Sequence, residues 1–167
     1  MQIASVNPSS MVNGDGIRLV IVFQGCSLDC DECFSPELFD FKKGKTVSAS
    51  RLARMIATAY KDDSYMLDGI TLSGGNPPEQ KELEAFLKEL KKIVPKLNIW
   101  MWTGFTWDEL QANKPFMAQL EYIDVVVTGR YEKDKKIEHH YFGSSNQEVW
   151  RRTDGEWVKD VGEKNDK

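Results

Sequence analysis

The chain contains few cysteines and histidines, no long apolar run and no excess of basic residues. Three of its 167 residues are cysteine and two are histidine, and its formal net charge is −4. This acidic balance argues against the basic surface that nucleic-acid binding requires. No apolar run approaches the roughly 20 residues that span a bilayer, and the first residues, MQIASVNPSS, lack the pattern of a secretory signal. We therefore expect a cytoplasmic protein that binds neither nucleic acid nor membrane.

The rest of the composition is typical of a globular protein with one core. Hydrophobic residues make up 41% of the chain and charged residues 29%. We find no internal repeat and no linker that would separate two domains. We expect a single domain over residues 1–161 and a disordered tail over residues 162–167.

Short apolar strands alternate with amphipathic helices along most of the chain. The segment RLVIVFQ at 18–24 is a β-branched and aromatic run that ends at a glycine, as expected of a buried strand. Helical spacing of apolar residues predicts helices at 48–59 and 79–94, and Thr106 to Glu109 has the form of a capping box. We expect further strands at 69–72, 98–102 and 123–127, an edge strand at 148–152 and a turn at 153–156. The alternation predicts β-α-β units and a mostly parallel sheet, which is an α/β fold.

All the cysteines lie in one short loop, as Cys26, Cys30 and Cys33. An odd number at such close spacing is a poor disulfide framework, because neighbouring pairs would close small, strained rings. In a cytoplasmic chain the cluster indicates a metal or redox site. The loop directly follows the first predicted strand, at the end of the strand where parallel sheets build their active sites.

Three thiolates suit an iron–sulfur cube with one iron left open. Each cysteine holds one iron, so the fourth iron has no protein ligand and is available to another molecule. A structural zinc completed by His139 or His140 is an alternative, although these histidines lie more than 100 residues away from the cysteines. Three unligated cysteines in a core are a second alternative.

Polar and glycine residues follow the other predicted strands. The second strand ends in Ser73, Gly74, Gly75 and Asn76, the third in Thr103 and Gly104, and the fourth in Thr128 and Arg130. Glycines allow a ligand to approach the backbone closely, and arginine favours bidentate pairing with a carboxylate. In the alternative reading, the glycine segment is only a turn into a helix and Arg130 only a surface cation. We expect all these residues to face one mouth together with the cysteine loop.

The Cys-x3-Cys-x2-Cys loop resembles the signature of radical S-adenosylmethionine enzymes. Within that superfamily, nearly the whole chain resembles the activating proteins of anaerobic ribonucleotide reductase. The similar segments run in the family's order over residues 6–157. They are Val12–Arg18, Gly25–Phe34, Leu72–Pro77, Trp100–Gly104, Asp124–Tyr131 and Gly143–Gln147.

The resemblance implies a fold, a reaction and a set of cofactors. It implies an incomplete, open β/α barrel with a [4Fe–4S] cluster on Cys26, Cys30 and Cys33 and no catalytic residue beyond these ligands. S-adenosylmethionine would chelate the open iron and be cleaved by one electron to methionine and a 5′-deoxyadenosyl radical. That radical would remove hydrogen from a glycine of the large reductase subunit. The resemblance places the cofactor contacts at Phe34, Ser73, Gly74, Gly75, Asn76, Thr103, Thr128 and Arg130.

The resemblance also implies protein partners. These are the large subunit of the anaerobic reductase and a one-electron reductant protein such as flavodoxin. Members of the family often pair with themselves, but nothing in this sequence demonstrates a homodimer.

Three positions depart from the family's pattern. An acidic residue is usual where Asn76 stands, aspartate where Thr128 stands, and proline in many members where Asp15 stands. The first two changes weaken the implied grip on the methionyl group or on a nearby cation.

Two other functions stay open: another small radical enzyme acting on a small molecule, and an iron–sulfur or zinc module without enzymatic activity. An electron carrier would normally hold its cluster with four cysteines, and this chain has three.

Overall fold

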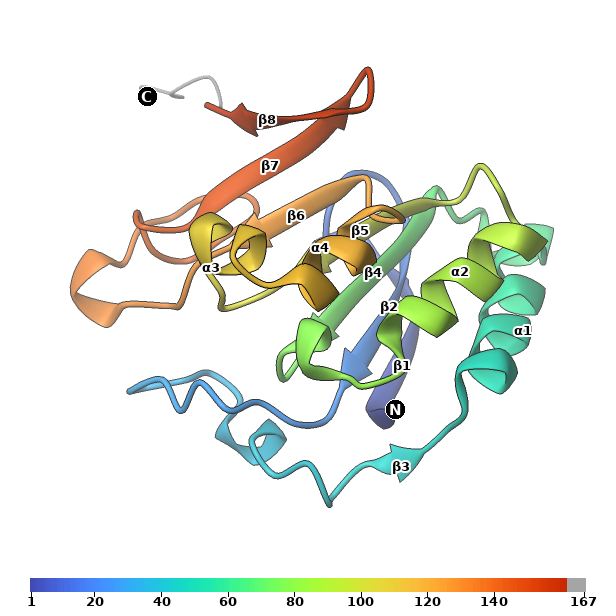
Figure 1. Ribbon diagram of the computed structural model, residues 1–167, viewed down its shortest axis with the longest axis horizontal. Helices are drawn as coiled ribbons and strands as arrows, with labels where there is room; N and C mark the ends of the chain where they lie inside the picture. The colour runs from blue at the N-terminus through green and yellow to red at the C-terminus, as the bar shows by residue number, and fades with distance from the viewer. Residues whose placement is uncertain (162–167) are drawn as a thin grey trace.

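The protein is built on one mixed sheet of eight strands (Figure 1). The computed structural model describes residues 1–161, so the tail predicted at 162–167 lies outside the described residues. The strand order is β3-β1-β2-β4-β5-β6-β7-β8. The strands are β1 Gln2–Ser10, β2 Arg18–Phe23, β3 Lys45–Thr46, β4 Gly69–Gly74, β5 Asn98–Trp102, β6 Val125–Thr128, β7 Glu148–Thr153 and β8 Glu156–Asp160.

The centre of the sheet is parallel, as the alternation of strands and helices predicts. Strands β2, β4, β5 and β6 pair in parallel, whereas β1 with β2, β6 with β7 and β7 with β8 pair antiparallel. Phe23 at the end of β2 pairs with Gly74 at the end of β4, and Trp102 at the end of β5 pairs with Val127 of β6. The carboxyl ends of the four strands therefore meet at one edge. The open barrel of the radical S-adenosylmethionine type stays a prediction.

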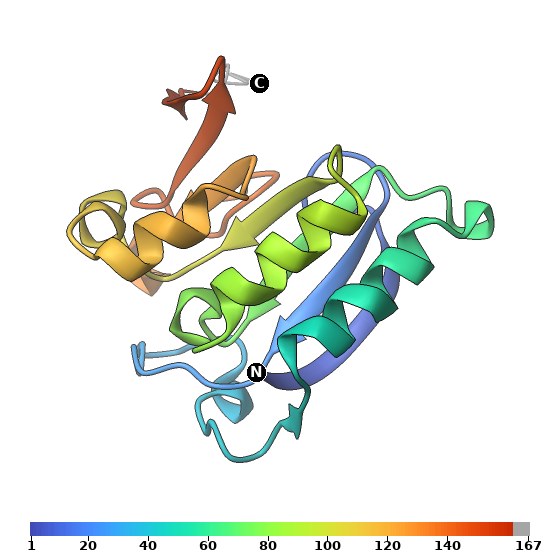
Figure 2. The same ribbon diagram turned by 45° about the vertical axis from the view of Figure 1, so that its right-hand side comes forward.

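The helices cover one face of the sheet, and Figure 2 shows α1, α2 and α4 lying across it. They are α1 Ala49–Tyr60, α2 Leu83–Ile93, α3 Trp107–Gln111 and α4 Lys114–Leu120. The predicted capping box on α3 is confirmed, because Thr106 accepts from the Glu109 amide and Glu109 accepts from the Thr106 amide. Within residues 1–161, no helix has the length and apolar character to cross a membrane.

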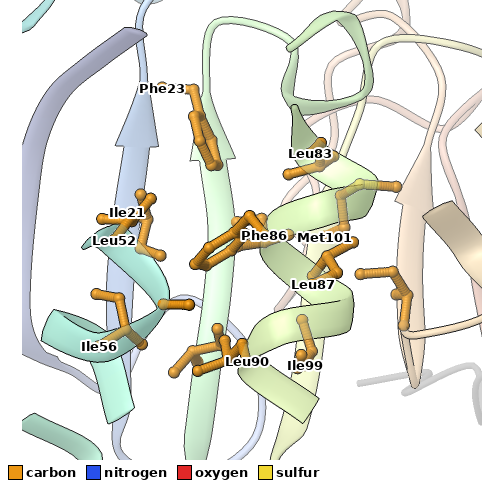
Figure 3. Packing of buried hydrophobic residues seen from close by; sticks show 14 of the residues in the cluster. Ile21, Phe23, Leu52, Ile56, Leu83, Phe86, Leu87, Leu90, Ile99 and Met101 are labelled. Atoms are coloured by element: carbon orange, nitrogen blue, oxygen red, sulfur yellow. The ribbon is translucent and has the colours of Figure 1, made fainter. Parts of the chain in front are cut away.

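The main core lies between these helices and the sheet (Figure 3). Helix α2 presents Leu83, Phe86, Leu87 and Leu90 at helical spacing, and all four side chains are fully buried. They meet a set of apolar side chains on β2 and β5, of which Figure 3 labels Ile21, Phe23, Ile99 and Met101. This layer of side chains fixes the helices against the strands that carry the site.

The opposite face of the sheet carries a smaller cluster around Trp100. Trp100 is 1% exposed and its ring stacks on the Trp102 ring, with the centroids 5.5 Å apart. The Arg151 guanidinium lies over the Trp100 ring, 4.9 Å from its centroid, and pairs with Asp15 at 3.1 Å. Tyr141 also donates its hydroxyl to Asp15. The residue that stands in place of the family's proline therefore ties the loop before β2 to β7.

Arg18 joins the amino ends of three strands. Its side chain is buried and donates to the Thr71 hydroxyl, the Ile70 carbonyl and both oxygens of Asn98, at 2.6–3.2 Å. Burial lowers the pKa of Arg18 to about 10, so the guanidinium stays charged near neutral pH. This network lies at the edge opposite to the cysteine loop.

Several elements differ from the sequence-based expectations. Strand β1, helix α4 and strand β8 were not predicted, and the strand expected at 123–127 is β6, Val125–Thr128. The helix expected from residue 79 begins at Leu83, because Pro77–Glu79 forms a separate 3₁₀ turn. The strand expected at 148–152 is confirmed as β7, but the expectation that it is an edge strand is wrong, because β7 pairs with β6 on one side and with β8 on the other. The turn expected at 153–156 is confirmed as the start of the hairpin between β7 and β8.

Replacing Leu87 with alanine tests the core. We expect Leu87→Ala to lower the free energy of unfolding by about 2–5 kcal/mol, because a fully buried side chain leaves a cavity. The control is Met55→Ala on α1, where the side chain is 52% exposed, and we expect a change of about 0.5 kcal/mol or less. Urea unfolding monitored by circular dichroism measures both, and equal losses would contradict this packing.

Candidate functional site

A cavity of about 220 Å³ lies where the carboxyl ends of the parallel strands meet the cysteine loop. The cavity brings together most of the residues expected at the site. Its lining includes Cys26, Cys30, Cys33, Phe34, Ser73, Gly74, Gly75, Thr103, Gly104 and Arg130. Asn76 and Thr128 are not among the lining residues, because both are buried behind the strand ends. The structure thus gathers four loop segments, distant in sequence, around one small space.

Backbone bonds fold the cysteine loop back onto the end of β2. Gly25, with φ +111°, donates to the Leu38 carbonyl at 2.8 Å, and the Cys26 amide donates to the Phe39 carbonyl at 3.2 Å. The Gln24 side chain donates to two more carbonyls of the returning segment, at 2.9 and 3.0 Å. The loop therefore has a defined start and end, and the cysteines lie between them.

The thiols are half-buried and form no disulfide with one another. Burial raises the pKa of the Cys26 thiol and of the Cys30 thiol, and the nearby Cys33 adds to the effect at Cys30. The Ser35 amide donates to the Cys33 sulfur at 3.4 Å. Metal binding deprotonates cysteine thiols, so the loop supplies three candidate ligands for a metal centre.

These donors fit an iron–sulfur cluster better than a single ion. Within the described residues, no three His, Cys, Asp or Glu side chains converge closely enough to hold one metal ion. A cube binds each thiolate at a different iron, so its ligands are spaced more widely than those of one zinc. His139 stacks on Phe142 at 3.8 Å and neither histidine lines the cavity, so the structure does not bring them to the cysteines.

Asn76 holds two of the loops together. The side chain is fully buried, and its Oδ1 accepts from the Thr103 hydroxyl at 2.7 Å. Its Nδ2 donates to Glu79 Oε2 at 2.9 Å, and its backbone amide donates to the Gly25 carbonyl at 2.9 Å. Thr128 is 1% exposed and donates its hydroxyl to the Glu148 carbonyl at 3.4 Å. Asn76 and Thr128, which stand where the resemblance leads us to expect acidic residues, therefore both form hydrogen bonds within the protein.

Glu79 is a residue of the site that the sequence did not reveal. The oxygen that accepts from Asn76 also accepts from the Ser27 amide at 3.1 Å, next to the first cysteine. One carboxylate thus links the glycine-rich segment to the cysteine loop. The only signal in the sequence was an acidic residue three positions after Asn76.

Arg130 lines the cavity but already has a carboxylate partner. Its guanidinium donates two bonds of 3.0 Å to the two oxygens of Glu109, in the bidentate geometry that arginine favours. The pair lowers the pKa of Glu109 and raises that of Arg130. Glu109 also caps α3, so the cap and the cavity wall share one side chain.

Phe34 and Tyr131 form an aromatic pair at the mouth of the cavity. Their ring centroids lie 4.7 Å apart, and Phe34 is 74% exposed. Exposure of so large a ring next to Cys33 leaves this side of the cysteine loop open to solvent. The pair can cover a bound cofactor or contact an incoming protein.

Fold and site together define an α/β protein with a three-cysteine loop at the carboxyl edge of a parallel sheet. Residues 12–150 match the family model described as a 4Fe-4S single cluster domain. An anaerobic ribonucleoside-triphosphate reductase-activating protein of Enterobacteria phage T4 is 30% identical over 158 residues, covering 93% of this chain and 97% of that protein.

Proteins with the same name in bacteria are similar as well. The protein of Pasteurella multocida is 33% identical over 87% of this chain and 94% of its own length. The protein of Escherichia coli K12 is 32% identical over 85% of this chain and 93% of its own length. The chain therefore belongs to the family of anaerobic ribonucleoside-triphosphate reductase-activating proteins and contains a 4Fe-4S domain.

Restoring an acidic side chain at position 76 tests the buried network. Asn76→Asp would place a second carboxylate against Glu79 Oε2 in a fully buried position. We expect the free energy of unfolding to fall by about 1–3 kcal/mol or more near neutral pH. Burial and like charge raise the pKa of the new carboxyl in the folded state above its unfolded value. The stability loss therefore grows as the pH rises through that raised pKa and shrinks as the pH falls.

Urea unfolding at about pH 5 and about pH 8 measures this dependence. The matched control is Asn7→Asp, because Asn7 is exposed on β1 and its side-chain oxygen accepts from the Ser9 amide, which an aspartate can still do. A loss that is independent of pH, or equal in the control, would contradict the buried pairing of Asn76 with Glu79.

Proposed function

We propose that the protein is an oxidoreductase that reductively cleaves S-adenosylmethionine and generates the glycyl radical of an anaerobic ribonucleotide reductase. The observation that carries the proposal is the set of three cysteine ligands, with no fourth in the chain, on a cavity that is also lined by a glycine-rich strand end. The names of the relatives support the reductase as the protein substrate. The 4Fe-4S family model supports the cluster.

Cys26, Cys30 and Cys33 would hold the cluster in this proposal. When bound, the cluster and S-adenosylmethionine supply the one-electron cleavage that yields methionine and a 5′-deoxyadenosyl radical. In this proposal the residues of the chain bind the cluster and S-adenosylmethionine and orient them. The loop from Gln24 to Phe39 holds the thiols in place, and Glu79 anchors the start of that loop to the glycine-rich segment.

The strand ends would bind the methionyl part of the ligand. Ser73, Gly74 and Gly75 offer backbone groups at the cavity, and Thr103 adds the end of β5. A Cβ on Gly75 would lie 2.2 Å from the Gly25 carbonyl oxygen, so only glycine fits there. Asn76 and Thr128 would act from behind by fixing these strand ends, since their side chains bond within the protein. Arg130 would offer its guanidinium to the ligand carboxylate while Glu109 holds it in position.

The open side of the cavity suits a protein substrate. Phe34 is exposed beside the cysteines, and a second hollow, of about 700 Å³, runs past Cys30 along residues 130–134. A glycine-bearing loop of the reductase would approach here. We extend the proposal to a one-electron donor protein such as flavodoxin and to self-association, both of which rest on the family resemblance.

Anaerobic reconstitution with iron and sulfide tests the function. We expect about four irons per chain, an electron paramagnetic resonance signal of a reduced cube, and 5′-deoxyadenosine when a reductant and S-adenosylmethionine are added. With the large reductase subunit present, a glycyl radical should appear in the same spectrum. Replacing Cys26, Cys30 or Cys33 singly by alanine should abolish cleavage.

Each alternative function predicts a different result in this reconstitution experiment. A protein that binds zinc or forms no cluster would overturn the assignment. Cleavage of S-adenosylmethionine without a glycyl radical on the reductase would favour a small-molecule radical enzyme instead. Ser27→Ala serves as the control for the cysteine variants, because it changes a side chain in the same loop but removes no thiol, and the bond to Glu79 comes from its backbone amide.

A further inference from the structure

The segment Gly143–Gln147 folds against the end of β6. Asn146 Nδ2 donates to the Arg130 carbonyl at 2.8 Å, and Gln147 Nε2 donates to the Gly129 carbonyl at 3.0 Å. Two consecutive side-chain amides thus hold two consecutive carbonyls. The residues they hold, Gly129 and Arg130, both line the cavity.

Both polar atoms of the Gln147 side chain bond within the protein. Its Oε1 accepts from the Gly143 amide at 3.1 Å and from the Ser144 amide and hydroxyl at 3.2 Å each. Ser144 is completely buried and also receives the Glu132 amide on its hydroxyl at 3.2 Å. Gln147 lies at the cavity, and the oxygen and the nitrogen of its side chain both bond to the backbone around it.

Gly129 has a backbone conformation that requires glycine at this strand end. Its φ is +101°, which L side chains rarely adopt, and a Cβ there would lie 3.3 Å from the Gln147 Cα and the Asn146 carbonyl oxygen. On the other side the Gly129 amide donates to the Phe105 carbonyl at 2.8 Å. The strand end is thus held from both sides just before Arg130 turns its side chain toward Glu109.

We propose that Asn146 and Gln147 are positioning residues that set the cavity wall opposite the cysteines, and so the placement of Arg130 and Tyr131 for S-adenosylmethionine. The inference rests on the proposed function. It follows from the geometry because the two amides fix the backbone from which Arg130 and Tyr131 project. Tyr131 in turn carries the ring that packs on Phe34 at the mouth.

Isosteric variants separate positioning from folding. Gln147→Glu keeps an oxygen acceptor for Gly143 and Ser144 but loses the donor to the Gly129 carbonyl. Asn146→Asp loses the donor to the Arg130 carbonyl in the same way. The matched control is Gln119→Glu, because Gln119 is buried and donates to the Pro78 carbonyl at 3.1 Å but does not line the cavity.

Two readouts are compared across these reconstituted proteins. We expect Gln147→Glu and Asn146→Asp to weaken S-adenosylmethionine binding, measured by calorimetry, by about tenfold each. Their iron content and melting temperature should change no more than in Gln119→Glu. In cluster-free protein, hydrogen–deuterium exchange at residues 129–132 should rise in both variants and stay at the wild-type level in the control.

The outcomes distinguish this inference from the proposed function. Unchanged S-adenosylmethionine binding in both variants, or an equal loss of binding in the control, would overturn the positioning role. The proposed function would still stand in that case, provided that the wild-type protein binds S-adenosylmethionine. Wild-type protein that carries a cluster but binds no S-adenosylmethionine would overturn the proposed function and this inference together. In that case raised exchange at 129–132 would show that the amides hold the strand end for a structural purpose only.

Discussion

The site depends on parallel pairing that continues past the ends of β2 and β4. The Gly75 amide donates to the Phe23 carbonyl, and the Asn76 amide donates to the Gly25 carbonyl, both at 2.9 Å. These bonds bring the backbones of the cysteine loop and the glycine-rich segment into direct contact, at a distance that a side chain on Gly75 would prevent. Every other feature of the cavity is placed relative to this contact. The thiols stand on one side of it and the ends of β5 and β6 on the other.

The buried Asn76 side chain is the second constraint on the site. Asn76 bonds to Thr103, Glu79 and Gly25 at once, which a carboxylate in the same place could not do without facing Glu79. The carboxylate of this network is Glu79, at the end of the 3₁₀ turn that follows Asn76. Asn76 and Thr128, the two departures seen in the sequence, both bond within the protein at the strand ends.

Sequence reasoning located the residues at the strand ends because the carboxyl ends of parallel strands must share an edge. It could not find the bond of Glu79 to the cysteine loop or the pairing of Glu109 with Arg130, because these depend on turn geometry and on partners far along the chain. It missed β1 because most of that strand is exposed and polar, and so carries no apolar signal. It missed α4 because this helix is short, and because its N-cap Asn113 and the following Pro115 are residues that are also common in loops. The central parallel sheet was predictable, since its buried strands are short runs of apolar residues between turn signals.

Asp15 connects parts of the chain that are 136 residues apart, through its ion pair with Arg151. Arg151 in turn lies over Trp100 and pairs with Asp160 in β8. The Arg151 side chain therefore links the loop before β2 to the hairpin of β7 and β8. The thermodynamic consequence is coupling: detachment of the C-terminal hairpin would break the contacts of Arg151 with Asp15 and Trp100, so the stability of the hairpin and that of the N-terminal loop are linked.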